Sequence, residues 1–269
     1  AYTREFVLFS DCTMANPNGD MINDNRPRQD ERTGKLEMSD VRIKRYVRDE
    51  WLARNEKVFV RPVKNEKGEY IDCKSVAEKT IKDEKIKESE LEQFLKSNYI
   101  DVKLFGAVVT KPKFNITGPL QIMWSRSINE AEIKFAQGTS VFTSKKEAKQ
   151  GTIWSKYFTP YALFKTNMVY NDMTAKLQNI SVSDDDIAKF IDALISGIKN
   201  YKSTSKNQMP RLLVEVVYNK NYIDGELDYI KVKSNIPDLE LRSVEMFEFD
   251  LEPLAEYYEK KKDLIYSVN

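Results

Sequence analysis

Apolar runs with the pattern of β-strands recur along the chain. In the first run, residues 4–13, the four consecutive side chains from Phe6 to Phe9 are all apolar and lie among residues that favour β-structure. Because successive side chains of a strand point to opposite faces, we expect this strand to be buried on both sides. The same signals predict further strands at residues 99–107, 116–126, 159–170 and 211–218.

Other stretches repeat apolar residues at helical spacing. One begins at Ser39 or Asp40 and has apolar residues at i, i+4 and i+8 from Ile43, which predicts an amphipathic helix with an apolar back. A second, stronger amphipathic helix is predicted after Ser183. Residues 74–96 are rich in Lys and Glu, and we expect them to form an exposed pair of helices.

The predicted order is strand, helix, strand, strand, helix, strand. This βαββαβ order is typical of ferredoxin-like and RNA-recognition (RRM-like) folds, so the predicted fold class is α+β. We expect an RRM-like palm formed by residues 1–54, 99–127 and 157–269. A helical insertion at 55–98 and a protruding thumb β-hairpin at 128–156 would interrupt it.

The composition excludes several kinds of chemistry. The chain has no histidine, which removes Ser/His and Cys/His nucleophilic catalysis and histidine-ligated zinc. Three aspartates at 184–186 resemble metal ligands, but acids in the first turn of a helix favour its dipole, and we prefer that interpretation. The cysteines, Cys12 and Cys73, fit a reducing compartment, and no apolar run is long enough for a membrane span, so we expect a cytoplasmic protein.

Charge is balanced overall but segregated along the chain. There are 43 Lys and Arg against 42 Asp and Glu. Residues 26–61 hold eleven basic against seven acidic residues, whereas residues 238–256 hold seven acidic residues and a single base. One face of the protein is therefore suited to a polyanion such as nucleic acid.

The run Asn16-Pro17-Asn18-Gly19-Asp20 is the sharpest local signal. It predicts a tight turn with a residue at φ > 0, in which the main-chain N–H groups of Asn18 and Gly19 converge on an anion. Arg26 and Arg28 follow in sequence, and the next helix carries basic residues off its apolar stripe, namely Arg42, Lys44, Arg45 and Arg48. On the predicted hairpin, lysines including Lys145 and Lys146 alternate with aromatic residues, a combination that suits nucleic-acid backbone and bases.

An ordered set of short motifs resembles a known family, the RAMP-superfamily backbone subunit of type I CRISPR surveillance complexes (Cascade). The resemblance covers most of the chain and is closest to subtype I-B, with I-C near. The motifs are Asn16–Asp20, Asn25–Asp30, Gly34, Asp40–Arg45, Arg48–Asp49, Leu104–Gly106, Gly118–Gln121, Trp124–Ser127, Pro160–Leu163 and Met209–Leu213.

The resemblance implies a non-enzymatic role in antiviral defence, without a metal or other cofactor. Copies of the subunit would stack head to tail along a CRISPR RNA, hold its ribose-phosphate backbone whatever its sequence, and leave bases free to pair with target DNA. Further partners would be the 5′-handle-binding RAMP subunit, the large subunit and the small subunit. The expected RNA contacts are Asn16, Asn18, Gly19, Arg26, Arg28, Arg42, Lys44, Arg45, Arg48, Gln121, Ser125, Arg126, Ser127, Lys145 and Lys146.

Three alternatives remain open at this level. The chain resembles less closely the type III backbone subunits, which cut target RNA with a divalent metal, and Asp20, Asp24 or Asp30 would then be catalytic. The oxygen-rich residues 16–25, with Asp20, Asn23, Asp24 and Asn25 as ligands, are also compatible with a calcium loop. A general RNA-binding module is the third. The acidic residues 238–256 are either a contact with the next copy or a solvated surface.

Overall fold

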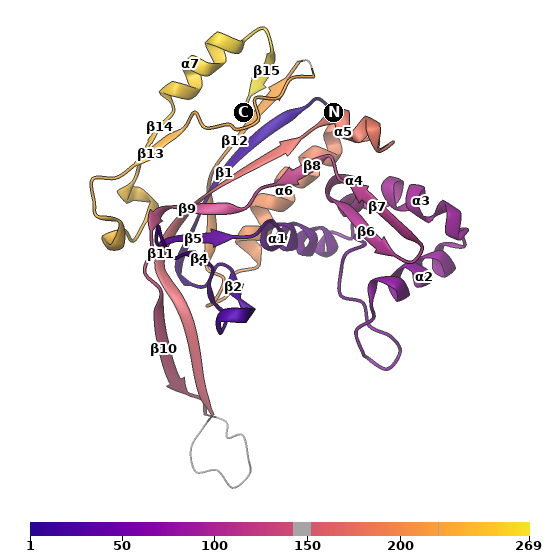
Figure 1. The fold of residues 1–269 in the computed structure, drawn as a ribbon, viewed down its shortest axis with the longest axis horizontal. Coiled ribbons are helices and arrows are strands. Elements are labelled where there is room, and N and C mark those ends of the chain that lie inside the picture. Colours follow the sequence, from indigo (N-terminus) through magenta and orange to yellow (C-terminus); the bar gives the residue numbers. More distant parts are fainter. Residues whose placement is uncertain (142–151, 220) are drawn as a thin grey trace.

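A single antiparallel sheet of nine strands runs through the computed structural model, which describes residues 1–141, 152–219 and 221–269. The strand order is β15-β12-β1-β11-β9-β5-β4, and β8 and β10 also pair with β11 (Figure 1). The strands of this sheet are β1 (Arg4–Ala15), β4 (Gln29–Asp30), β5 (Lys35–Met38), β8 (Leu120–Ile122), β9 (Ser125–Glu130), β10 (Lys134–Thr139), β11 (Ile153–Tyr170), β12 (Gln208–Tyr218) and β15 (Ile265–Val268).

The remaining strands form three small two-stranded sheets: β2 (Gly19–Asp20) with β3 (Arg26–Pro27), β6 (Gly106–Thr110) with β7 (Lys113–Thr117), and β13 (Lys231–Lys233) with β14 (Glu248–Asp250). The α-helices are α1 (Asp40–Ala53), α2 (Cys73–Glu84), α3 (Leu91–Asn98), α4 (Ile100–Phe105), α5 (Asp172–Leu177), α6 (Asp184–Asn200) and α7 (Glu252–Lys261). Short 3₁₀ turns are η1 (Met21–Asn23), η2 (Glu88–Glu90), η3 (Asp238–Glu240) and η4 (Val244–Met246).

Strand β1 is buried on both faces, which confirms the prediction from its sequence. Phe6 and Leu8 belong to the core that includes residues of α1 and α6. Val7 and Phe9 point the other way, into a second core that includes residues of the C-terminal segment 227–265. The central strand is thus held between two hydrophobic layers, as its continuous apolar run requires.

Helices α1 and α6, both predicted from their apolar stripes, pack directly against each other. The indole Nε1 of Trp51 in α1 donates to the carbonyl of Lys189 in α6 at 3.3 Å. The backbones come so close at Gly197 that a Cβ there would lie 2.4 Å from the carbonyl oxygen of Tyr46. Glycine is therefore required by this contact, despite its low helix propensity.

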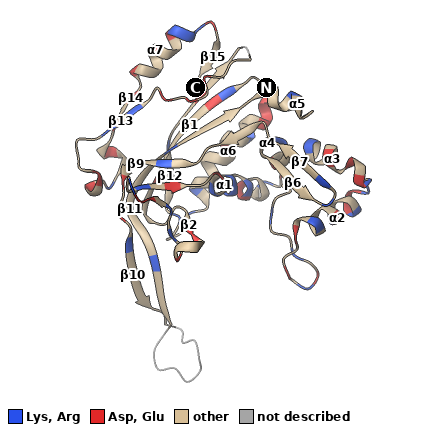
Figure 2. Ribbon diagram, in the orientation of Figure 1, with Lys and Arg blue, Asp and Glu red and all other residues tan. Residues whose placement is uncertain are grey.

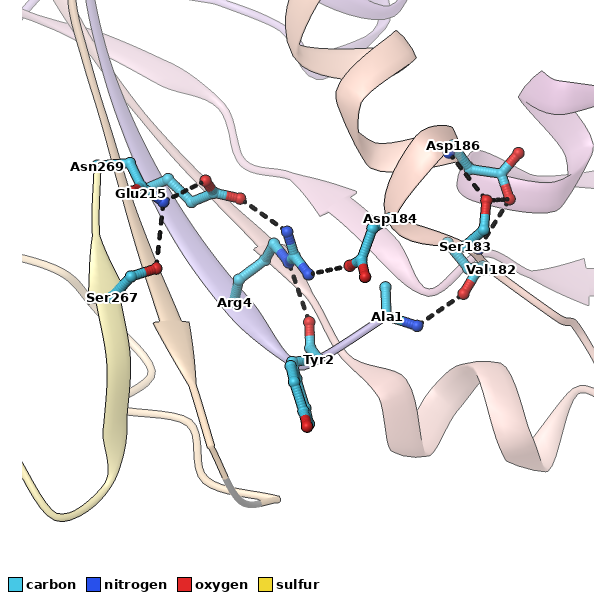
Figure 3. A network of polar contacts seen from close by, with 10 residues as sticks. All are labelled: Ala1, Tyr2, Arg4, Val182, Ser183, Asp184, Asp186, Glu215, Ser267 and Asn269. Carbon is cyan, nitrogen blue, oxygen red and sulfur yellow. Dashed lines mark hydrogen bonds and ion pairs between the residues drawn. The ribbon is translucent and has the colours of Figure 1, made fainter.

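The three aspartates at the start of α6 are used structurally, as the sequence analysis preferred. Ser183 and Asp186 form a capping box, in which each side chain accepts from the other residue's main-chain N–H. Asp184 pairs with Arg4 at 2.9 Å, and Lys103 pairs with Asp186 at 3.0 Å. The same arginine reaches Glu215, so that a network of polar contacts ties β1 to α6 and β12 (Figure 3).

The prediction of a strand at residues 99–107 is wrong. Residues 100–105 form helix α4, in which every residue except Lys103 is buried, so this short apolar run fits a core helix as well as a strand. The strand predicted at 116–126 is divided between β7, β8 and β9. The expected pair of exposed helices is present as α2 and α3, which lie with β6 and β7 on the opposite side of the molecule from the hairpin (Figure 1).

Strand β11 is longer than predicted, because it begins at Ile153 rather than at residue 159. Its first part pairs with β10, from Lys134 opposite Phe158 to Thr139 opposite Ile153, and forms a hairpin that projects from the sheet (Figure 1). Its second part pairs with β1 along the full length of that strand. One continuous strand therefore connects the core to the projection.

Replacing Gly197 by Val should lower the free energy of unfolding by about 2 kcal/mol, because the new side chain meets main-chain atoms of α1 that have little room to move. Urea denaturation followed by circular dichroism measures the change. Lys199→Val, at an exposed position of α6, is the matched control and should change stability by about 0.5 kcal/mol or less. Equal effects of the two substitutions would contradict the close helix contact.

Candidate nucleic-acid interface

The loop after β1 is fixed by the side chains of its asparagines. Asn16 Nδ2 donates to the carbonyl of Asn25 at 2.7 Å, and Asn18 Oδ1 accepts from the N–H of Ser39 at 2.8 Å. A Cβ on Gly19 would lie 1.9 Å from Asn25 Oδ1, so a larger residue here would displace the Asn25 side chain. Asn18 therefore ties the loop to the start of α1, and Gly19 lets the loop close on itself.

The predicted left-handed residue is not in the Asn16–Asp20 run. In this loop, positive φ occurs at Asp24 (51°) and Asn25 (57°), where the chain turns back after η1. Asn and Asp tolerate this conformation better than other non-glycine residues. The expectation of a turn with φ > 0 at Asn16–Gly19 is thus wrong, and the run works through side-chain bonds and close packing instead.

A lysine that the sequence analysis missed lies beneath this loop. Lys206 Nζ donates to the carbonyl of Asn16 at 2.6 Å, because the residues before β12 run beside the end of β1. Burial, followed by the positive charge of Arg42, lowers the pKa of the Lys206 ammonium. Arg42 in turn stacks on Tyr46, with its guanidinium carbon 4.0 Å from the ring centroid.

Three polar atoms in this region are buried without a hydrogen-bond partner in the described part of the chain: Asn16 Oδ1, Arg28 Nε and Arg42 Nε. Buried polar groups in proteins are nearly always paired. Two of the three, Arg28 Nε and Arg42 Nε, belong to cationic side chains near the loop that the sequence predicts to bind an anion. Polar side chains of the loop and of the first turn of α1 are therefore packed with three hydrogen-bonding atoms unused.

The other basic residues of α1 are engaged within the protein. Lys44 pairs with Asp40 at 2.9 Å, and Arg45 pairs with Asp49 at 2.7 Å on the exposed surface. Arg48 Nε donates to Asp101 at 3.1 Å. Of the three bases, Arg45 is the most exposed, with half of its side chain accessible to solvent.

The ion pair of Arg48 with Asp101 is largely buried and joins α1 to α4 and to the segment at residues 59–60. Asp101 is fully buried in α4 and also accepts the main-chain N–H groups of Phe59 and Val60, at 2.8 and 2.9 Å. Arg48 lies between this carboxylate and the ring of Phe105. Its role in the structure is to neutralise a buried charge, which sequence spacing alone could not reveal because the partner lies 53 residues away.

Arg26 joins the loop to the hairpin. Its guanidinium carbon lies 5.1 Å from the centroid of the Tyr157 ring, and Tyr157 contacts Phe135 across the hairpin with ring centroids 4.9 Å apart. A cavity of about 210 Å³ lies beside this stack, lined by polar loop residues and by Tyr157. The pocket at the base of the hairpin therefore places two arginines, Arg26 and Arg28, beside the Tyr157 ring, together with three acids, Asp20, Asp24 and Glu31.

The hairpin has two different faces. Phe135 and Tyr157 share one face, whereas Lys134, Lys156 and Trp154 share the other, because residues opposite each other in an antiparallel pair point the same way. Basic residues lie along both strands (Figure 2). Lys145 and Lys146, which the sequence analysis placed on this hairpin, lie outside the described residues.

The polar residues around β8 and β9 fall into two groups. Ser125 and Ser127 are almost fully buried; Ser125 bonds Thr166 at 2.5 Å and Ser127 accepts from the N–H of Leu36 at 2.9 Å. They are not at the surface where the sequence analysis expected them, because the alternation of β9 turns them inward. Arg126 points outward and pairs with Glu37 at 3.1 Å. Gln121 Nε2 donates to the carbonyl of Gly118, within its own turn.

Asp20, one of the loop acids, has structural partners. The side chain of Asn23 and the N–H of Ile22 donate hydrogen bonds to the Asp20 carboxylate and lower its pKa, so Asp20 caps η1 in its ionised form.

Burial and the neighbouring Asp11 raise the pKa of the Cys12 thiol to about 12, which makes Cys12 a poor nucleophile. Among the residues that the structure describes, no three acids or cysteines cluster in a way that would hold a metal ion.

Three contact residues of this interface were missed from sequence: Tyr157, Trp124 and Lys206. Trp124 is exposed and lies beside Arg28, with 6.0 Å between the guanidinium carbon and the ring centroid. Two signals were available in the sequence, a Trp in the polar motif at 124–127 and an aromatic residue next to Lys156. Within the described residues, no helix is long and apolar enough to cross a membrane.

Fold and site together define a class: a mixed α/β protein with a curled antiparallel sheet, from which a basic and aromatic hairpin projects beside a loop that carries Arg26 and Arg28. The chain belongs to the family of the CRISPR-associated protein Cas7, whose model matches residues 2–252. This confirms, at the level of the family, the resemblance seen in the sequence motifs.

Relatives agree with this assignment. The CRISPR-associated protein Cas7 of Haloferax volcanii is 27% identical over 291 aligned residues, which cover 97% of this chain and 84% of that protein. A chain of a solved "CRISPR RNA-guided surveillance complex, pre-nicking" has a TM-score of 0.56 at 16% identity, covering 82% of this chain and 80% of that one. A chain of a second "CRISPR RNA-guided surveillance complex" has a TM-score of 0.52 at 14% identity, with coverages of 98% and 84%. These two likenesses establish a shared fold.

Arg48→Ala should lower the free energy of unfolding by about 3 kcal/mol, because it leaves the buried carboxylate of Asp101 without its cation. Arg45→Ala, which removes an exposed pair on the same helix, should cost about 0.5 kcal/mol or less. Chemical denaturation of both variants gives the comparison. A loss at Arg48 no larger than that at Arg45 would show that the Arg48–Asp101 pair is not structural.

Proposed function

We propose that this protein is the guide-RNA-binding backbone subunit of a type I CRISPR surveillance complex. The observation that carries the proposal is the contact of Arg26 with Tyr157, which brings the two loop arginines, Arg26 and Arg28, and the aromatic face of the hairpin together beside one pocket. Membership of the Cas7 family supports it.

The geometry suits sequence-independent binding of single-stranded RNA. Cations such as Arg26 and Arg42 neutralise phosphates, while the rings of Tyr157 and Phe135 offer flat faces to bases. Neither kind of contact distinguishes one base from another. The RNA sequence is then left to be read by pairing with target DNA.

The strand order supports a finer assignment of the fold. Strands β12, β1, β11 and β8 are neighbours in that order and antiparallel, with α1 between β1 and β8 in the chain and α6 between β11 and β12. This is the arrangement of a βαββαβ palm. We assign the palm to residues 1–54, 99–127 and 157–269, the insertion to 55–98 and the thumb to 128–156.

In this role the protein stacks head to tail with further copies of itself along the CRISPR RNA. Its other partners are target DNA paired to the guide, the 5′-handle-binding RAMP subunit, the large subunit and the small subunit. It acts in the cytoplasm, without catalysis, in a complex of the I-B-like branch. The proposed RNA contacts are Asn16, Asn18, Gly19, Arg26, Arg28, Arg42, Lys44, Arg45, Gln121, Arg126, Lys145, Lys146, Tyr157 and Lys206.

Size-exclusion chromatography with light scattering on the purified protein, with sequencing of any RNA that copurifies, tests the proposal. Multimers loaded with repeat-derived RNA are the expected result. A protein that stays monomeric and RNA-free when guide RNA and partner subunits are added would overturn it. Metal-dependent cleavage of RNA paired to the guide, lost in Asp20→Asn, would instead favour the type III alternative.

Arg26→Ala should weaken binding of single-stranded RNA to a similar extent for all sequences and reduce the slope of log K against log salt by about one, because one phosphate contact is lost. Fluorescence anisotropy at several salt concentrations measures both quantities. Lys113→Ala, an exposed cation on β7 of the insertion side, is the control and should leave both unchanged. An unaltered slope for Arg26→Ala would remove this residue from the interface.

A further inference from the structure

An irregularity between β8 and β9 brings a tryptophan to the surface. Ile122 lies opposite Met168, and the N–H of Met123 donates to the carbonyl of Asn167 at 2.9 Å. The pairing resumes with Arg126 opposite Lys165. Two residues, 124 and 125, therefore face the single residue 166 of β11, which is the arrangement of a β-bulge.

The bulge separates the two side chains that it contains. Ser125 turns inward and bonds the hydroxyl of Thr166, as described above. Trp124 turns outward and is 56% exposed, whereas Trp51 in the core is 1% exposed. An inserted residue that directs a large ring into solvent contributes little to the core, and bulges of this kind often aim a side chain at a ligand.

The exposed ring has a cationic neighbour that belongs to the proposed RNA interface. Arg28 lies over Trp124 and also lines the pocket beside Tyr157. Arg26 and Arg28 are two residues apart in an extended segment, so their Cα atoms are roughly 6.5 Å apart. Each of these arginines contacts a different ring, Arg26 that of Tyr157 and Arg28 that of Trp124.

We propose that Trp124 is a second stacking platform of the interface, on which a base of the bound single-stranded RNA lies while Arg28 neutralises an adjoining phosphate. The inference rests on the proposed function and extends it to a residue outside the loop and the hairpin. An RNA is the occupant that fits, because the exposed ring is bordered by the cation of Arg28, and Arg26 lies two residues away in the same segment. Stacking on an exposed indole beside a guanidinium is a sequence-tolerant way to hold a base.

The test is the affinity of Trp124→Ala for a single-stranded RNA of mixed sequence, measured by anisotropy at several salt concentrations. Loss of one stacked base should reduce affinity roughly 5- to 150-fold. The slope of log K against log salt should not change, because no charge is removed. Trp124→Phe should recover most of the affinity, because a smaller ring can still stack.

Tyr70→Ala is the matched control. Tyr70 is 71% exposed and lies under Lys64, so it is also an aromatic–cation pair, but it belongs to the insertion. Its loss should leave RNA affinity unchanged. Ultraviolet crosslinking of the unaltered protein to uridine-containing RNA, followed by peptide mass mapping, provides a measurement that needs no variant, and an adduct at Trp124 is expected.

The outcomes separate this inference from the proposed function. If Trp124→Ala binds RNA as tightly as the unaltered protein, the platform is overturned and the backbone role stands. If the variant binds RNA normally but no longer forms multimers, Trp124 contacts a second copy, and the platform is again overturned. If the unaltered protein binds no RNA even with partner subunits, both proposals fail together.

Discussion

The register between β1 and β11 fixes the position of the whole interface. Ala15, at the end of β1, lies opposite Thr159 in β11. After β1 the chain continues into the loop that carries Arg26 and Arg28. The part of β11 that precedes Thr159 forms the hairpin with β10. Tyr157 is two residues from Thr159, so the loop and the aromatic face of the hairpin are neighbours by the geometry of one strand pair. A shift of one residue in this register would turn Tyr157 to the other face of the hairpin.

That register is well specified because both strands are buried where they pair. Phe6 and Leu8 face the helices while Val7 and Phe9 face the C-terminal segment, so a slip would exchange the two layers and misplace every side chain of the strand. The polar residues of β1 lie towards its ends, where Arg4 pairs with Glu215 and Asp11 with Arg211. The more exposed loop therefore follows directly from a strand that is held by packing on both of its faces.

Local patterns predicted the parts of the structure that depend on local forces. The sequence indicated β1, α1, α6 and a hairpin, because the spacing of apolar residues and the helix-capping residues can be recognised within a short stretch of sequence. It did not indicate α4, since Ile100 and Leu104 are compatible with either a strand or a short helix until their burial is known. The partners of Arg48 and of Ser125 could not be predicted either, because Asp101 and Thr166 are brought to them by the fold.

The distribution of partners among the cations explains how a protein of nearly zero net charge can hold a polyanion. Arg48 is already paired with the buried carboxylate of Asp101, so it would contribute little binding energy to an RNA phosphate nearby. Arg26 stacks on a ring, and Arg28 lies beside the Trp124 ring with a long contact to Asp20, at 3.9 Å. An arginine held by an aromatic face keeps its hydrogen-bond donors free and its orientation fixed. The cations suited to phosphate are therefore those that rest on Tyr157 and Trp124, and the same rings are available to bases.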